Sequence, residues 1–214
     1  MGAKAWFVAY HNGNPKETLA QNPTLDREAS LKIAKIFSSN ASFVELDDGD
    51  LADLQPPTNE ICVGVYDGLT IVAQEGLMLD APSKLNPRWY LNGSARYTYL
   101  HLTHSVVDWF AYGLWKDGEL QRSLSVAPDS GIMEDVGMRP RFEDPFWAGD
   151  HAVEDDDEEF SYLLPFHPLE MAEASLLEYL GFQLEGFPTA WVCEPESIPI
   201  MHFKVQKTAW WKFW

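Results

Sequence analysis

The stretch EICVGVYDGLTIVAQEG, residues 60–76, decides the fold class. Two runs rich in β-branched residues flank an Asp-Gly pair at 67–68, and glycine tolerates the positive φ that a tight hairpin turn demands. Counting outward from the turn pairs Tyr66 with Leu69. Both faces of this hairpin are largely apolar, so we expect other elements to cover both of them.

A second hairpin is predicted in DWFAYGLWKDGELQRSLSVA, residues 108–127, which turns at another Asp-Gly pair. The same counting pairs Trp115 with Leu120 and Ala111 with Leu124. In that register one face of the hairpin is a core face. It is made of Trp109, Ala111, Trp115, Leu120, Leu124 and Val126.

Two helices accompany the hairpins. The first carries apolar residues at helical spacing, and the second begins at a proline and has a glycine just past its end. The apolar stripe of the first helix is Ala29, Ile33, Ile36 and Phe37, and Thr24 or Asp26 would cap its N-terminus. The stripe of the second helix is Leu169, Ala172, Leu176 and Leu180, and Gly181 follows it. This order of elements predicts an α+β fold: a single domain over 1–205 with a mainly antiparallel sheet and two principal helices, then a Trp-rich C-terminal tail over 206–214.

The charge balance excludes several classes of partner. The 214 residues include 33 acids and 15 Lys or Arg, a formal net charge of −18. Binding to nucleic acid or to anionic lipid needs clustered Lys and Arg, so we expect neither partner. No segment reaches the roughly 18 apolar residues of a membrane span, and Cys62 and Cys193 show no metal-ligand spacing. We therefore expect a soluble protein of the reducing cytoplasm.

Three phrases carry a resemblance to a known family. They are the opening MGAK, the segment YLHLTHSVVDWFAYGLWKDGELQRSLSVAPDSGIMEDVG at 99–137, and PFHPLEMAEASLLEYLGFQLEG at 165–186. Over Met1 to Val205 the chain resembles an uncharacterised, mainly actinobacterial family of bacterial proteins with a domain of unknown function. The resemblance implies a bacterial intracellular protein and brings no catalytic residues with it.

The segment YLHLTHSVVDWFAYGLW, residues 99–115, is the first candidate site. On a helix, His101, His104 and Asp108 would share one face and could bind a metal together with a fourth ligand. On a regular strand, His101 and His104 would point to opposite faces unless a bulge intervenes. The β-branched and aromatic residues favour the strand, and with it a polar network inside the core.

A hydrolase is the second candidate. It would use His104, Asp108, Asp150, His151 and His167, with or without a divalent metal, and Ser105 or Ser130 could act as the nucleophile. The chain contains no GxSxG motif. No cofactor is predicted, and a divalent metal is the one cofactor that the pattern leaves open.

Aromatic residues suggest binding rather than catalysis. Trp147 lies among acidic residues, and the tail contains Trp210, Trp211 and Trp214, which are costly to leave in water. Tryptophan is enriched at the energetic centres of interfaces. The leading interpretation is a non-catalytic binding protein for a small ligand or a protein partner, in the manner of an immunity or inhibitor protein, or a homo-oligomer. Whether the chain is an enzyme is left open.

Overall fold

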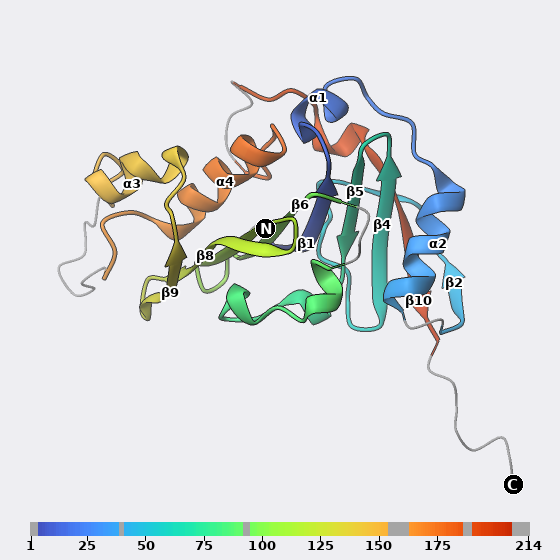
Figure 1. Ribbon diagram of the computed structural model, residues 1–214, viewed down its shortest axis with the longest axis horizontal. Helices are drawn as coiled ribbons and strands as arrows, with labels where there is room; N and C mark the ends of the chain where they lie inside the picture. Colours follow the sequence, from blue (N-terminus) through green and yellow to red (C-terminus); the bar gives the residue numbers. More distant parts are fainter. Residues whose placement is uncertain (1–3, 39–40, 92–94, 154–162, 186–189, 207–214) are drawn as a thin grey trace, which may run out of the picture.

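An antiparallel sheet runs through the whole molecule (Figure 1). The computed structural model describes residues 4–38, 41–91, 95–153, 163–185 and 190–206. Within these ranges the strands lie in the order β2-β10-β4-β5-β1-β6-β7-β8-β9, and β3 also pairs with β10. Their bounds are β1 (Lys4–His11), β2 (Phe43–Glu45), β3 (Gly49–Asp50), β4 (Glu60–Tyr66), β5 (Leu69–Ala73), β6 (Tyr97–His104), β7 (Trp109–Lys116), β8 (Glu119–Ala127), β9 (Gly131–Gly137) and β10 (Pro199–Val205).

Helices cover the sheet from both sides. The α-helices are α1 (Pro15–Leu19), α2 (Arg27–Phe37), α3 (Asp144–Ala148) and α4 (Pro168–Tyr179). Short 3-10 helices are η1 (Glu75–Leu77), η2 (Pro82–Lys84), η3 (Pro87–Trp89), η4 (Arg141–Glu143) and η5 (Pro195–Ser197). The α+β prediction, with one domain, a mainly antiparallel sheet and two principal helices, is confirmed. Among the described residues, no helix combines the length and the apolar character that crossing a membrane requires.

The first predicted hairpin has the expected register. Tyr66 pairs with Leu69 across β4 and β5, and Gly68 has a φ of 75° at the turn. Hydrophobic residues are buried on both sides of this hairpin, as its two apolar faces predict. Because successive side chains of a strand point to opposite faces, alternate residues of this hairpin are buried on opposite sides of the sheet.

The predicted register of the second hairpin is wrong beyond the pair of Trp115 and Leu120. Trp115 does lie opposite Leu120, but the register shifts between Leu114 and Trp115, so that Ala111 lies opposite Ser125. A bulge adds one residue to one strand, and a shift of one residue moves every later side chain to the other face. Leu124 and its neighbour Val126 consequently leave the face that Trp109 and Ala111 share.

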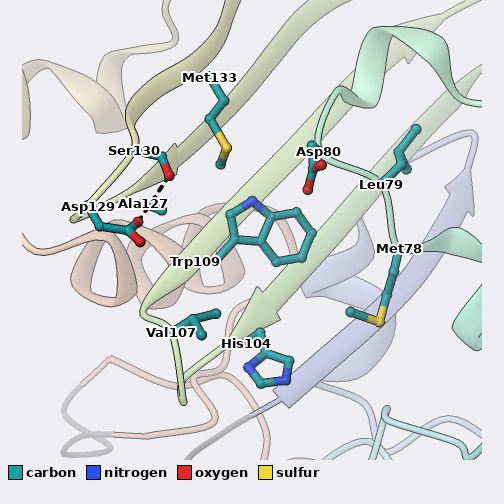
Figure 2. A pocket seen from close by; sticks show the side chains of 10 residues that line it. All are labelled: Met78, Leu79, Asp80, His104, Val107, Trp109, Ala127, Asp129, Ser130 and Met133. Atoms are coloured by element: carbon teal, nitrogen blue, oxygen red, sulfur yellow. Dashed lines mark hydrogen bonds between the residues drawn. The ribbon is translucent and has the colours of Figure 1, made fainter.

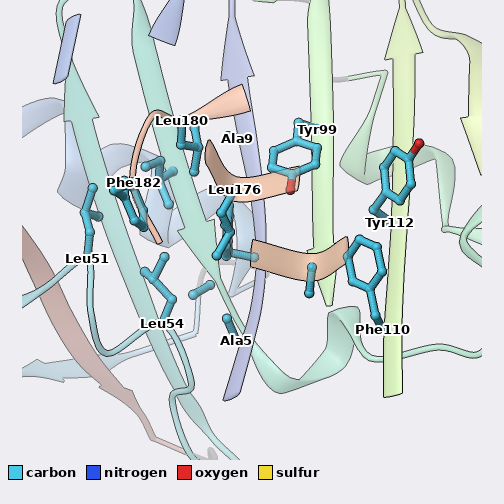
Figure 3. Close-up of a cluster of buried hydrophobic side chains, with 14 of the residues drawn as sticks. Ala5, Ala9, Leu51, Leu54, Tyr99, Phe110, Tyr112, Leu176, Leu180 and Phe182 are labelled. Atoms are coloured by element: carbon cyan, nitrogen blue, oxygen red, sulfur yellow. The ribbon is translucent and has the colours of Figure 1, made fainter. Parts of the chain in front are cut away.

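The first core lies between the sheet and α4. Leu176 of α4 and Leu180 just beyond it pack with Phe110 and Tyr112 of β7, and Leu51, Leu54 and Phe182 extend this core over the other half of the sheet (Figure 3). Gly181 has a φ of 82° directly after the helix, as its predicted place beyond the helix end requires.

The second core lies on the opposite face, beneath α2 and the segment that contains η1, η2 and η3. Helix α2 is capped by Asp26, whose side chain accepts the N–H of Ala29 at 2.9 Å. Its predicted stripe is off by one position: Ile36 is 62% exposed, and Ser30 and Ala34 are buried with Phe37. The Ser30 hydroxyl accepts the N–H of Val65 in β4 at 3.0 Å, so a polar contact helps to set the rotation of the helix.

Two predicted segments lie largely outside the described residues. The acidic run 154–159 is one of them. The tail is the other: Gln206 is described and donates its N–H to the Ser42 carbonyl at 2.7 Å, while Trp210, Trp211 and Trp214 fall outside.

Candidate functional site

The hairpin of β6 and β7 places two of its residues beside each other at its closed end. His104 pairs with Trp109 across the turn at 105–108, and Asp108 adopts a φ of 48° within it. Leu100, Leu102 and Trp109 belong to the second core. By strand alternation His104 faces the same side as they do.

A pocket of about 500 Å³ opens at this end of the second core (Figure 2). Two turns, a loop and the strands beside them build it: the β6–β7 turn, the β8–β9 turn, the segment after η1, and strand β9. Its lining consists of Met78, Leu79, Asp80, His104, Val107, Trp109, Ala127, Asp129, Ser130 and Met133. Figure 2 shows the Trp109 indole at the centre, with the other side chains arranged around it.

Trp109 is a fixed floor for this pocket. The residue is buried, and its indole N–H donates to the Ser125 hydroxyl at 3.1 Å. Ser125 itself is completely buried in β8. A buried indole usually needs a partner for its one donor, and this bond fixes the orientation of the ring. The serine is available because the bulge turns it to this face.

The polar groups of the pocket have few partners. His104 Nδ1 is buried and has no hydrogen-bond partner within the described part of the chain. Ser130 donates its hydroxyl to Asp129 at 3.0 Å, and Asp80 is exposed. These groups surround an apolar centre formed by the indole, Met78 and Met133. A hollow of this size with a few polar groups on an apolar wall is the usual form of a small-molecule site.

His101 lies on the opposite face and belongs to the first core. Its Nδ1 is 2.8 Å from the Tyr99 hydroxyl, and its Nε2 is 2.6 Å from the Thr103 hydroxyl. The ring stacks on Phe7 with centroids 5.4 Å apart. Burial lowers the pKa of His101 to about 3, so the ring is neutral. The Tyr99 hydroxyl also lies 2.7 Å from the Ser175 hydroxyl, so the hydrogen-bond network of His101 reaches helix α4.

The predicted metal ligands are therefore not brought together. His101 and His104 point to opposite faces of β6, as a regular strand requires. Asp108 lies instead near His167, with its Oδ2 3.8 Å from Nε2 of that ring. Over the described ranges, no three His, Cys, Asp or Glu side chains are grouped so that they could hold a metal ion.

The other predicted catalytic residues surround the start of α4. His167 caps this helix, because its Nδ1 accepts the N–H of Leu169 at 3.3 Å. His151 stacks on Phe146 at 4.1 Å, and its Nδ1 is 3.3 Å from Oε2 of Glu170.

Asp150 follows Gly149, the C-cap of helix α3, and is exposed. Its backbone N–H donates to the Pro145 carbonyl at 3.0 Å. Of the five predicted catalytic residues, the structure pairs only Asp108 with His167 by a contact between their side chains.

Trp147 takes part in a buried ionic network that the sequence does not reveal. Its indole N–H donates to Glu143 Oε2 at 2.7 Å, and the Arg139 guanidinium lies 4.0 Å above its ring. Glu143 is completely buried and also accepts the Tyr112 hydroxyl. Burial and the neighbouring carboxylate of Glu143 raise the pKa of Tyr112 well above its ordinary value.

Arg122 is the cation at the centre of this network. Its Nε and Nη2 each donate to Glu143 at 2.8 Å, which forms a bidentate pair, and its Nη1 donates to Asp135. Burial opposes the charge of Arg122, but the hydrogen bonds that it donates to both carboxylates outweigh this effect and raise its pKa. Sequence reasoning missed this pair because the predicted register placed Arg122 opposite Gly113, on the face of Trp109, whereas the observed register turns it into the first core.

The comparisons with known proteins agree with the resemblance of the sequence. A family model described as "Family of unknown function (DUF6928)" matches residues 5–203. No curated protein and no solved structure matches the chain. The matched span includes every residue of the pocket and of the ionic network, and it covers most of the chain. The chain therefore belongs to this family of unknown function.

Proposed function

We propose that this protein is a non-catalytic binding protein that holds a small organic ligand in the Trp109 pocket. The observation that carries the proposal is the fixed, buried indole at the centre of a hollow of about 500 Å³. Ligand pockets typically measure between about 300 and 1,000 Å³ and combine apolar walls with a few polar groups. Both features are present here.

The side chains that line the pocket suit a small ligand better than they suit the flat surface of a protein partner. Met78 and Met133 are unbranched and polarisable, so they can adapt to the outline of a guest. Val107 is 57% exposed at the mouth, where a bound ligand would cover it.

The hydrolase interpretation has less support from the described residues. Ser130 donates to Asp129 rather than to a histidine. His167 uses one ring nitrogen to cap α4 and faces Asp108 with the other, so neither nitrogen is placed to accept a proton from a serine.

We also place the protein in the bacterial cytoplasm. Cys62 and Cys193 are free, buried thiols, as is usual in a reducing compartment. We also propose that the family occurs mainly in actinobacteria.

The test is a small-molecule screen read at the indole N–H of Trp109. Nine tryptophans give overlapping fluorescence, so ¹H–¹⁵N spectra are used, and the Trp109→Phe variant assigns the signal. Val107→Trp should fill the mouth and weaken binding of every hit at least tenfold. Val44→Trp is the matched control, because Val44 is 47% exposed on β2 at the far edge of the sheet.

Two outcomes would contradict the proposal. One is a broad screen in which no compound shifts the Trp109 signal. The other is a set of hits that bind Val107→Trp as tightly as they bind the Val44→Trp control.

A further inference from the structure

The charges of the Trp109 pocket all have one sign. Among the described residues, its lining contains two carboxylates, Asp80 and Asp129, and no lysine or arginine. Over the part of the chain that the structure describes, Asp80 makes no hydrogen bond or ion pair, and Asp129 accepts only the hydroxyl of its neighbour Ser130. The pocket is therefore a place where negative charge is left uncompensated.

The floor of the pocket favours positive charge as well. The face of an indole ring carries negative potential, and tryptophan is the aromatic residue that attracts cations most strongly. Trp109 cannot turn away, since its N–H is bonded to Ser125. In Figure 2 the Asp80 carboxylate and the Met133 sulfur both point toward the ring. A guest on the indole would thus meet a carboxylate and a polarisable sulfur.

The carboxylates of the pocket select the kind of guest. An ammonium group has several N–H donors and no acceptor, so it suits a wall that offers carboxylate oxygens. An anion would face two carboxylates instead and would be repelled.

We propose that the ligand of the Trp109 pocket is a small organic cation, an amine with an apolar or aromatic body. The body lies on the indole between Met78 and Met133, and the ammonium group binds Asp80 or Asp129. This inference rests on the proposed function, because it specifies the ligand of the same pocket.

Three probes with one body and three charges test the inference: tryptamine as the cation, tryptophol as the neutral analogue and indole-3-propionate as the anion. Each is titrated into the full chain while the Trp109 indole signal is followed. Tryptamine should bind at least tenfold more tightly than tryptophol, and the propionate should bind most weakly. Raising the salt concentration should weaken tryptamine binding and leave tryptophol binding unchanged, because only the charged pair is screened.

Charge-removing variants locate the effect. Asp80→Asn and Asp129→Asn together should reduce tryptamine affinity at least tenfold and change tryptophol affinity less than twofold. Asp67→Asn is the control for charge outside the pocket: it removes one carboxylate where the pocket pair removes two, it lies in the β4–β5 turn, and an Asn-Gly turn is as favourable as an Asp-Gly turn. It should leave both affinities unchanged.

The outcomes separate this inference from the proposed function. If tryptophol binds as tightly as tryptamine and both shift the Trp109 signal, the cation preference is overturned while the ligand pocket stands. If Asp67→Asn weakens tryptamine as much as the pocket variants do, the attraction is that of an acidic chain in general, and the inference is again overturned. If neither these probes nor the broad screen shifts the signal, both proposals fall.

Discussion

Replacing His101 with glutamine should make the stability of the protein less sensitive to acid. The ring of His101 is completely buried and its pKa is lowered from 6.5 to about 3. In the unfolded chain the same ring takes up a proton below about pH 6.5. Between pH 6.5 and 3 the unfolded state therefore binds one more proton than the folded state, so stability falls as the pH falls.

The size of the effect follows from the difference between the two pKa values. At pH 4.5 the unfolded ring is two units below its pKa, while the folded ring is still neutral. Each unit is worth about 1.4 kcal/mol, so after a small correction for the charge already present at pH 7, the loss is roughly 2.5 kcal/mol. His101→Gln lacks a titrating group at this position, yet an amide can accept from one of the hydroxyls of Tyr99 and Thr103 and donate to the other.

The assay is urea unfolding at pH 7 and pH 4.5 for the wild type and for His101→Gln. The variant loses ring stacking at both pH values, so that constant cost cancels when the change between the two pH values is compared. We expect the wild type to lose about 2–3 kcal/mol more than the variant over this interval. His151→Gln, which removes a half-exposed histidine, should behave as the wild type does. Equal pH responses of wild type and His101→Gln would refute the argument.

Three further changes have defined outcomes. Glu143→Gln should cost about 3–5 kcal/mol in urea unfolding, because it leaves the guanidinium of Arg122 buried without its bidentate partner. Burial raises the pKa of Glu173 from 4.5 to about 7, so this carboxyl should make stability fall as the pH rises from 4.5 to 7, by up to about 3 kcal/mol, and Glu173→Gln should remove that dependence. Gly137→Ala should cost more than about 2 kcal/mol in thermal unfolding, since its Cβ would lie 2.1 Å from the Gln121 carbonyl oxygen at a φ of 87°.

The controls for these changes differ. Gly76→Ala should alter stability by less than about 0.5 kcal/mol, since nothing lies within 4 Å of the added Cβ. Arg139→Gln removes a half-exposed cation from the edge of the network and should cost under about 1 kcal/mol; a loss as large as that of Glu143→Gln would contradict the role given to burial. His101 and Glu173 change stability in opposite directions over the same pH interval. Each is therefore measured as a difference from the wild type, and a Glu173→Gln variant with an unchanged pH response would show that this carboxyl is not desolvated.

Local patterns predicted the parts of the fold that local chemistry determines. The Asp-Gly pairs marked both hairpin turns, because the positive φ at Gly68 and Gly118 is a property of the turn itself. The limits of α4 follow from Pro168 and Gly181 for similar reasons. The rotation of a helix about its axis depends on the residues that it packs against. For α2 one of these contacts is polar, from Ser30 to strand β4, and the spacing of apolar residues could not predict it.

The pocket could not be predicted because no single segment contains it. Met78, Trp109 and Ser130 come from parts of the chain that meet through the pairing of β5, β1, β6, β7, β8 and β9. His104 and Ser130 were candidates for catalysis because of their residue types. Their surroundings indicate binding instead, since the side chains between them are apolar.

One bulge accounts for both the pocket floor and the buried ionic network. In the register predicted from the turn, Leu124 would lie beside Ala111, and the indole of Trp109 would have no serine to bond. The observed shift brings Ser125 to that face and turns Arg122 into the first core, where Glu143 meets it.

A register error of one residue in β8 would therefore separate the guanidinium from its carboxylate and leave both charges without compensation, a cost of several kcal/mol. A buried ion pair adds little net stability over an apolar pair, but it penalises the wrong register strongly. We infer that Arg122 and Glu143 serve to fix the register on which the Trp109 pocket depends.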